Sequence, residues 1–145
     1  MAKTKGSPSR AEALTALSAL REWLPVNQLR AMWKLTAGEE GAFYLQKLVE
    51  TDGHIQAMPV TYTEREKKED AVISLYYFHG GSDWYIIEKD IEGGVSQAWG
   101  FAILNGDGQN AETGYISITE LIELGVELDL YFTPITLATA RAKHS

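Results

Sequence analysis

The stretch AVISLYYFHGGSDWYIIEK, residues 71–89, decides the fold. Its apolar and aromatic side chains form two runs separated by the pair Gly80-Gly81. A glycine pair between two such runs is typical of a hairpin, because glycine adopts a positive φ without steric cost. We therefore expect a buried strand over 71–78 and a return strand over 84–89. Alternation puts the side chains of the return strand on two faces, Trp84, Ile86 and Glu88 on one and Tyr85 and Ile87 on the other.

The residues after this hairpin predict the rest of an antiparallel sheet. Strands are expected over 97–104 and 114–117, where apolar and aromatic residues gather. The segment Ser117-Ile118-Thr119-Glu120 is a capping box that opens a short helix, and Gly125 suits its end. Residues 126–132 then alternate apolar and polar side chains, as a half-buried strand does.

Upstream of residue 60 the apolar spacing changes from two residues to the 3.6-residue period of helices. A capping box of Ser9 and Glu12 opens a first helix, and Pro25 closes it. The leucines expected on its core face are Leu14, Leu17, Leu20 and Leu24.

Two more helices are expected before the sheet. The first runs over 27–35 with Asn27 as its N-cap. The next runs over 39–51, opened by a capping box at Thr36 and closed by Gly53. The mixed-charge run that follows, residues 64–70, is expected to be a solvated loop. A phosphate-facing loop is its alternative, through Arg65, Lys67 and Lys68.

The order of these elements predicts the α+β class: N-terminal helices followed by an antiparallel meander sheet of about five strands with one inserted short helix. A chain of 145 residues suits one domain over 1–145. The helical part is expected over 10–58 and the sheet part over 71–134, whereas 1–8 and 138–145 are expected to be loose.

The amino-acid composition excludes several kinds of site and segment. The chain has no cysteine, which excludes disulfides, thiolate nucleophiles and cysteine-based metal sites. No apolar run approaches the roughly 18 residues that a spanning helix needs, so no membrane association is expected. The N-terminal residues lack the apolar region of a signal peptide, and a cytoplasmic location is the expectation.

The charge is uneven. Residues 1–68 hold 10 Lys and Arg against 8 Asp and Glu, whereas residues 69–145 hold 3 against 12. An acidic C-terminal half repels phosphate backbones, which makes direct nucleic-acid binding unfavourable. It suits a basic protein partner, or a protein that mimics nucleic acid.

No catalytic or metal-binding motif stands out. His79 and Asp83 flank the hairpin glycines, but hairpin turns favour these residue types, and no nucleophile motif accompanies them. The histidines His54, His79 and His144 lack the spacing of a zinc site. The loop starting at Asn105 lacks the glycine and glutamate of a calcium loop. We therefore expect no catalytic residue, metal or cofactor.

Four segments carry a resemblance to a known group of domains: 83–88, 99–102, 112–121 and 128–134. Over residues 71–137 the chain resembles small uncharacterised domains of phages, plasmids and integrative elements. These include the domain of unknown function 2958 and domains attached to large polyvalent phage proteins. The resemblance implies an accessory protein of a mobile element and supplies no catalytic residue. An arginine usual before the last strand is missing at 127–129. The matching residues are Trp84, Glu88, Gly100, Glu112, Gly114, Tyr115, Glu120 and Asp129, of which Gly100 and Gly114 are expected to be structural.

The first hypothesis is therefore a non-enzymatic protein-binding module with an acidic, aromatic-rimmed face. Its candidate binding residues are Trp84, Glu88, Trp99, Glu112, Tyr115, Glu120 and Asp129. One alternative is a small hydrolase-like enzyme that pairs Glu88 with Glu112 or Glu120, which requires these acids to converge. Another is an acidic anti-defence mimic of nucleic acid. The strand aromatics could form a stacking platform, although core packing is the commoner role.

Overall fold

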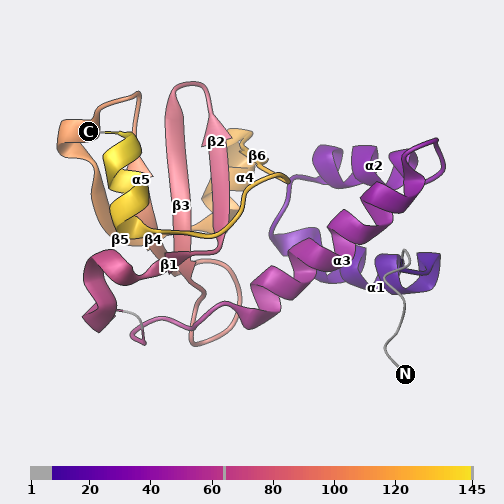
Figure 1. The fold of residues 1–145 in the computed structure, drawn as a ribbon, viewed down its shortest axis with the longest axis horizontal. Helices are drawn as coiled ribbons and strands as arrows, with labels where there is room; N and C mark the ends of the chain where they lie inside the picture. The colour runs from indigo at the N-terminus through magenta and orange to yellow at the C-terminus, as the bar shows by residue number, and fades with distance from the viewer. Residues whose placement is uncertain (1–7, 64, 145) are drawn as a thin grey trace.

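The computed structural model describes residues 8–63 and 65–144, and it has the α+β architecture that the sequence predicts (Figure 1). The α-helices are α1 (Arg10–Ala19), α2 (Val26–Leu35), α3 (Gly41–Ala57), α4 (Ile118–Leu124) and α5 (Leu137–Lys143). The 3₁₀ helices are η1 (Leu20–Glu22), η2 (Arg65–Asp70) and η3 (Gly108–Asn110). The strands are β1 (Val72–Ile73), β2 (Leu75–His79), β3 (Ser82–Glu88), β4 (Ala98–Ile103), β5 (Glu112–Ile116), β6 (Glu127–Leu128) and β7 (Ile135–Thr136). Among the described residues, no helix is long and apolar enough to cross a membrane.

Five strands form an antiparallel sheet in the order β5-β4-β3-β2-β6. Strands β2 to β5 follow one another as a meander, and α4 carries the chain back to place β6 beside β2. The predicted hairpin is confirmed: His79 pairs with Ser82, and the two-residue turn between them has Gly80 at φ 56°. A separate pair of short strands, β1 and β7, lies outside this sheet.

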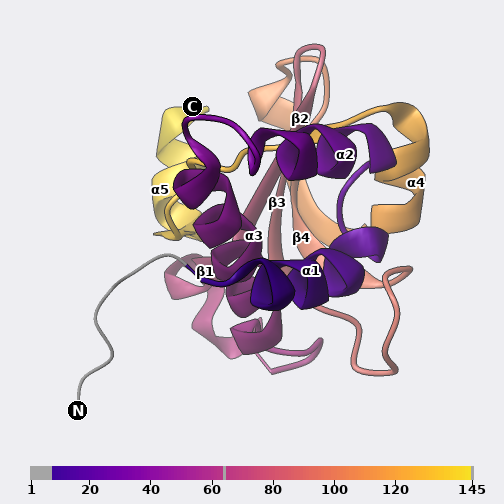
Figure 2. The same ribbon diagram turned by 90° about the vertical axis from the view of Figure 1, so that its right-hand side faces the viewer.

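Each face of the sheet has its own hydrophobic core. Trp84 and Ile86 share one core with buried residues of α1, α2, α3 and α4. Tyr85 and Ile87 belong to the other core, which α5 covers. Figure 1 shows α4 and α5 on opposite sides of the sheet, and Figure 2 shows α1 to α3 in front of it. Both faces of β3 are therefore buried, and each face carries one aromatic and one isoleucine side chain.

Two long side chains fasten the helices to the sheet. The hydroxyl of Tyr77, fully buried in β2, donates to the carbonyl of Trp23 at 2.6 Å. The ammonium of Lys89, just after β3, donates to the carbonyls of Ile55 and Gln56 at 2.9 and 3.0 Å. Both carbonyls lie in the last turn of α3, so the Lys89 ammonium also interacts favourably with the negative end of the helix dipole.

The capping box of Ser9 and Glu12 is present as predicted, but the N-terminal ends of α2 and α3 differ from the predictions. Pro25 is the residue before α2, and Asn27 lies inside the first turn. Thr36 closes α2 by donating its hydroxyl to the carbonyl of Trp33, so it does not open α3. Gly53 lies within α3, which continues to Ala57.

The buried face of α1 also differs. Ala13 and Ala16 are buried, whereas Leu14 is 51% exposed. The helix packs against α3, and both alanines belong to the core that contains Leu48 of α3. Leu20 and Leu24 are buried as expected.

Three predicted segments in the C-terminal half are corrected. The first strand is split at Ser74 into β1 and β2, which pair with β7 and β3. The strand expected over 126–132 ends at Leu128, because the Asp129 carboxylate accepts the Tyr131 N–H at 2.9 Å and bends the chain. The tail is not loose: residues 137–143 form α5, whose Leu137 and Ala140 are buried. The N-terminal segment expected to be loose lies outside the described residues except for Pro8.

Candidate functional site

A β-bulge decides where Glu88 points. Ile86 pairs with Gly100, but Glu88 pairs with Trp99, so Ile87 is an extra residue on β3. Directly opposed residues share a face of the sheet, which moves Glu88 to the face of Trp99 and of the α5 core. The predicted grouping of Glu88 with Trp84 and Ile86 is therefore wrong.

Glu88 is completely buried at this position. Its carboxylate accepts the backbone N–H of Tyr62 at 3.3 Å. The segment around Tyr62 runs beside the end of β3, because the Thr61 N–H donates to the Lys89 carbonyl at 2.8 Å and the Lys89 N–H donates to the Pro59 carbonyl at 2.8 Å. The hydrogen bond from the Tyr62 backbone N–H to this buried carboxylate anchors the crossing of the chain.

The three candidate glutamates do not meet. Glu112 pairs with Ala102, three residues along β4 from the partner of Glu88, a separation of about 10 Å along the strand. The odd spacing also puts Glu112 on the opposite face from Glu88. Glu120 is exposed in the first turn of α4, where the Ser117 hydroxyl accepts its N–H at 3.2 Å. The geometry gives no support to an enzyme that pairs these acids.

The predicted aromatic residues divide between core and surface. Trp84 is 7% exposed and belongs to the helix-side core. Trp99 is half-buried, and its ring meets that of Tyr115 edge to face at 5.3 Å. Tyr115 is 50% exposed, and its hydroxyl lies 2.7 Å from that of Tyr62. The aromatic rim therefore consists of Trp99 and Tyr115, supported by Tyr62. Asp129 lies at the other side of the sheet, beyond β6.

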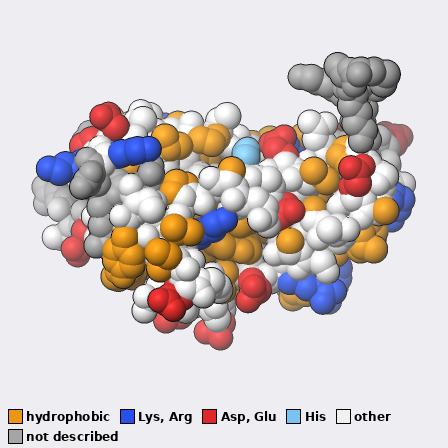
Figure 3. All heavy atoms as spheres, turned by 90° about the horizontal axis from the view of Figure 1, so that it is seen from below, with side chains coloured by type: hydrophobic (Ala, Val, Ile, Leu, Met, Phe, Trp, Pro, Cys, Tyr) orange, Lys and Arg blue, Asp and Glu red, His pale blue; other side chains and the backbone are white. Residues whose placement is uncertain are grey.

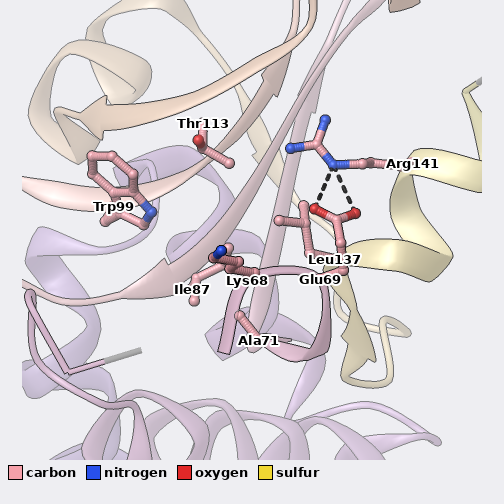
Figure 4. Close-up of a pocket in the computed structure, with 8 residues that line it drawn as sticks. All are labelled: Lys68, Glu69, Ala71, Ile87, Trp99, Thr113, Leu137 and Arg141. Carbon is pink, nitrogen blue, oxygen red and sulfur yellow. Dashed lines mark hydrogen bonds and ion pairs between the residues drawn. The ribbon is translucent and has the colours of Figure 1, made fainter. Parts of the chain in front are cut away.

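A cavity of about 300 Å³ lies on the α5 face of the sheet (Figure 4). Its floor spans three neighbouring strands through Ile87, Trp99 and Thr113. The remaining lining residues come from η2, from the residue after it and from α5: Lys68, Glu69, Ala71, Leu137 and Arg141. Because Thr113 belongs to the last strand of the sheet, the cavity reaches the sheet edge.

Two cations border this cavity. The Nε atom of Arg141 lies 2.9 Å from one carboxylate oxygen of Glu69 and 3.1 Å from the other. The guanidinium group lies 4.7 Å from the ring centre of Phe101, and its terminal nitrogens point away from Glu69 in Figure 4. Lys68 has φ 49° and ψ −117°, a backbone conformation that costs a non-glycine residue of order 1–3 kcal/mol. The backbone is therefore strained at Lys68, one of the two cationic residues that line the cavity.

The two edges of the five-stranded sheet differ. At the β6 edge, the side-chain amide of Gln28 from α2 bonds to both backbone groups of Leu128. At the β5 edge, no described segment adds a further strand. Glu112 and Tyr115 are exposed there, and a Cβ placed on Gly114 would meet no atom within 4 Å. Within residues 8–63 and 65–144, the outer side of β5 is therefore unpaired.

The hairpin histidine does not form a catalytic pair within the described residues. Asp83 accepts a short hydrogen bond from the Tyr76 hydroxyl, and none joins it to His79. Burial, together with this hydrogen bond, raises the pKa of Tyr76 above its ordinary value. Asp107 lies in the loop that starts at Asn105 and lacks the residues of a calcium loop. Its carboxyl group accepts hydrogen bonds from Asn110, which lower its pKa.

The acidic side chains do not form a continuous run on the face of the molecule seen in Figure 3. On the face drawn in Figure 3 they are scattered singly among apolar and basic side chains. A mimic of nucleic acid needs carboxylates in a continuous run at phosphate-like spacing. This face therefore gives no support to such a mimic.

Sequence reasoning missed the cavity residues Thr113, Leu137 and Arg141. Lys68 was noticed only as part of a charged loop, and the tail that supplies Arg141 was expected to be loose. One signal was available: Arg141 is one of only three cations in the acidic half, and it follows the buried position Leu137 at the i+4 spacing of a helix. No known family model, curated protein or solved structure matches this chain.

Proposed function

We propose that this protein is a non-enzymatic binding module that captures an extended segment of a partner protein along β5. The observation that carries the proposal is the contrast between the two sheet edges: α2 covers β6 through Gln28, whereas the edge at 112–116 is open among the described residues. Open edges are liabilities that proteins cover or blunt, unless they serve to bind a strand.

The local residues suit strand addition. Gly114 has no side chain, so a second backbone can approach β5 closely at its centre. Tyr115 offers an exposed aromatic surface at one end, and Glu112 offers a carboxylate at the other. A basic side chain opposite Glu112 would form a favourable cross-strand pair. The partner segment is therefore extended, with a basic residue on the face of Glu112.

The setting of this function rests on the resemblance described above. Domains similar to residues 71–137 occur in phages, plasmids and integrative elements, which supports an accessory role in a mobile element. The acidic balance of residues 69–145 supports a basic region on the partner.

Selection from an unbiased display library of ten-residue peptides tests the proposal, with binding mapped by backbone amide exchange. We expect the enriched peptides to be rich in β-branched residues with at least one Lys or Arg, and to protect amides of residues 112–114 from exchange. Binding by side chains alone would leave that exchange unchanged. Enriched peptides that protect another segment would overturn the proposal.

The variant Glu112→Lys provides the charge test. We expect it to weaken the selected peptides about five- to tenfold, since it turns an attractive cross-strand pair into a repulsive one. Glu123→Lys is the matched control, because Glu123 is exposed on α4 and lies outside β5. Equal weakening by both variants would indicate a general charge effect and would contradict binding at this edge.

A further inference from the structure

The cavity beside Thr113 lies where a strand added to β5 would place alternate side chains. A residue directly opposite Thr113 would point to the same face as Thr113, with Cβ atoms about 5 Å apart. That face carries the cavity, because Thr113 itself lines it. In strand-addition complexes the backbone bonds provide affinity, and pockets for alternate side chains provide specificity.

The charged residues that line the cavity indicate which functional group a side chain of the added strand would place there. Its lining holds Lys68 and Arg141, and Glu69 balances one of the two positive charges. The ion pair occupies Nε of Arg141, so the fork of terminal nitrogens is left on the other side of the guanidinium (Figure 4). Such a fork suits the two oxygens of a carboxylate, and a lysine ammonium adds a second donor.

Most of the remaining lining residues are apolar and suit the methylene groups of a short acidic side chain. Ala71, Ile87 and Leu137 contribute apolar surface. Such a surface would contact the methylene groups and exclude water from the charge pair, which strengthens it. The strained backbone of Lys68 is consistent with this role, because strain of this kind is kept where a side chain must be aimed at a ligand.

We infer that this cavity receives a carboxylate of the strand captured by β5. The inference rests on the proposed function. Together they predict that the partner segment has an acidic group on the face of Thr113 and a basic group on the face of Glu112. Adjacent residues of a strand point to opposite faces, so the captured segment carries an acidic and a basic residue next to each other. The carboxylate belongs either to an Asp or Glu side chain or to the C-terminus of the segment.

The first measurement examines the cavity without any peptide. Sodium acetate is titrated against sodium chloride at constant ionic strength, and the indole N–H signal of Trp99 is followed by NMR after assignment with Trp99→Phe. We expect a saturable shift in the wild type and in Lys143→Met, which removes an exposed cation of α5 that does not line the cavity. Arg141→Gln and Lys68→Met should abolish the shift. A shift that survives both substitutions would overturn the inference.

The second measurement uses the selected peptides. Replacing the acidic residue by its amide should weaken binding about tenfold for the wild type, and should have no effect for Arg141→Gln. If amidation of the peptide C-terminus produces this loss instead, the terminal carboxylate is the group bound. Protection of 112–114 without sensitivity to either change would overturn the inference and leave the proposed function intact. Acetate binding together with peptides that bind elsewhere would overturn both.

Discussion

Gln28 of α2 and Leu128 of β6 pair as two strands would, although 100 residues separate them in sequence. The side-chain Nε2 donates to the Leu128 carbonyl at 2.8 Å, and the side-chain Oε1 accepts the Leu128 N–H at 3.0 Å. A single amide thus replaces the next strand at this edge, where backbone groups would otherwise need water or a partner. The helical half closes one edge of the sheet, whereas no described segment pairs with the other.

Gln28→Leu tests this closure. The substitution leaves both backbone groups of Leu128 without their side-chain partner in a half-buried place, so we expect a loss of about 1–3 kcal/mol in the free energy of unfolding. Urea unfolding measures it. Asn27→Ala, one position earlier on the exposed side of α2, should change stability by less than about 0.5 kcal/mol. Equal effects would show that the pairing does not stabilise the edge.

Lys89→Met tests the link between α3 and the sheet. The methionine keeps most of the apolar stem but removes both hydrogen bonds to the carbonyls of Ile55 and Gln56. We expect about 1–2 kcal/mol of destabilisation, together with faster amide exchange in the last turn of α3. The control is Lys34→Met, an exposed lysine in the last turn of α2. Unchanged exchange at the end of α3 would refute the role given to Lys89.

Gly100 and Gly114 face each other across β4 and β5, yet they should respond oppositely to alanine. A Cβ on Gly100 would lie 2.0 Å from the Tyr85 carbonyl oxygen, so the central ladder must shift. We expect Gly100→Ala to cost about 2 kcal/mol or more. Gly114→Ala meets open space and should be neutral or slightly stabilising, because it reduces the freedom of the unfolded chain. Thermal unfolding of the two variants decides the matter, and a tolerated Gly100→Ala would contradict the packing described.

Tyr85 should make stability depend on pH in the alkaline range. Its hydroxyl lies 2.8 Å from Nε2 of His144, and burial, with a contribution from Asp83, raises its pKa from 10.0 to about 12. The folded state therefore holds the tyrosine proton more tightly than the unfolded state does. This contribution is fully present below about pH 10 and is lost as the pH rises toward 12.

Tyr85→Phe should therefore flatten the decline of stability between pH 10 and pH 11, measured by urea unfolding, and lower stability at neutral pH through loss of the hydrogen bond. Tyr76 and Tyr77 retain their own raised pKa values, so the decline becomes shallower but does not disappear. A variant with the same alkaline slope as the wild type would show that Tyr85 does not contribute.

Much of the fold was predictable because its signals are local. The turn at Gly80 follows from glycine chemistry, and the cap at Ser9 follows from side-chain reach to the N–H of Glu12. Helix α4 ends at Gly125, whose φ of 98° is a left-handed conformation that glycine adopts without steric cost. Such features depend on residues within a few positions of one another.

The candidate site was only partly predictable. Trp99 and Tyr115 were correctly placed on neighbouring strands, whereas Glu112 was expected outside the strand that it begins in the structure. Glu88 was assigned to the wrong face, because alternation counts residues and cannot register a bulge. The bulge arises from pairing between β3 and β4, which involves residues distant from Glu88 in sequence.

The sequence by itself determined the class of the fold, the hairpin at Gly80-Gly81 and the absence of cysteine chemistry. Only the tertiary structure decided that Gln28 closes one sheet edge, that no described segment pairs with the outer side of β5, and that Lys68, Thr113 and Arg141 border one cavity. The reason is physical: turns, caps and periodicity are encoded over a few residues, whereas an edge or a cavity exists only where distant segments pack together, or where none does.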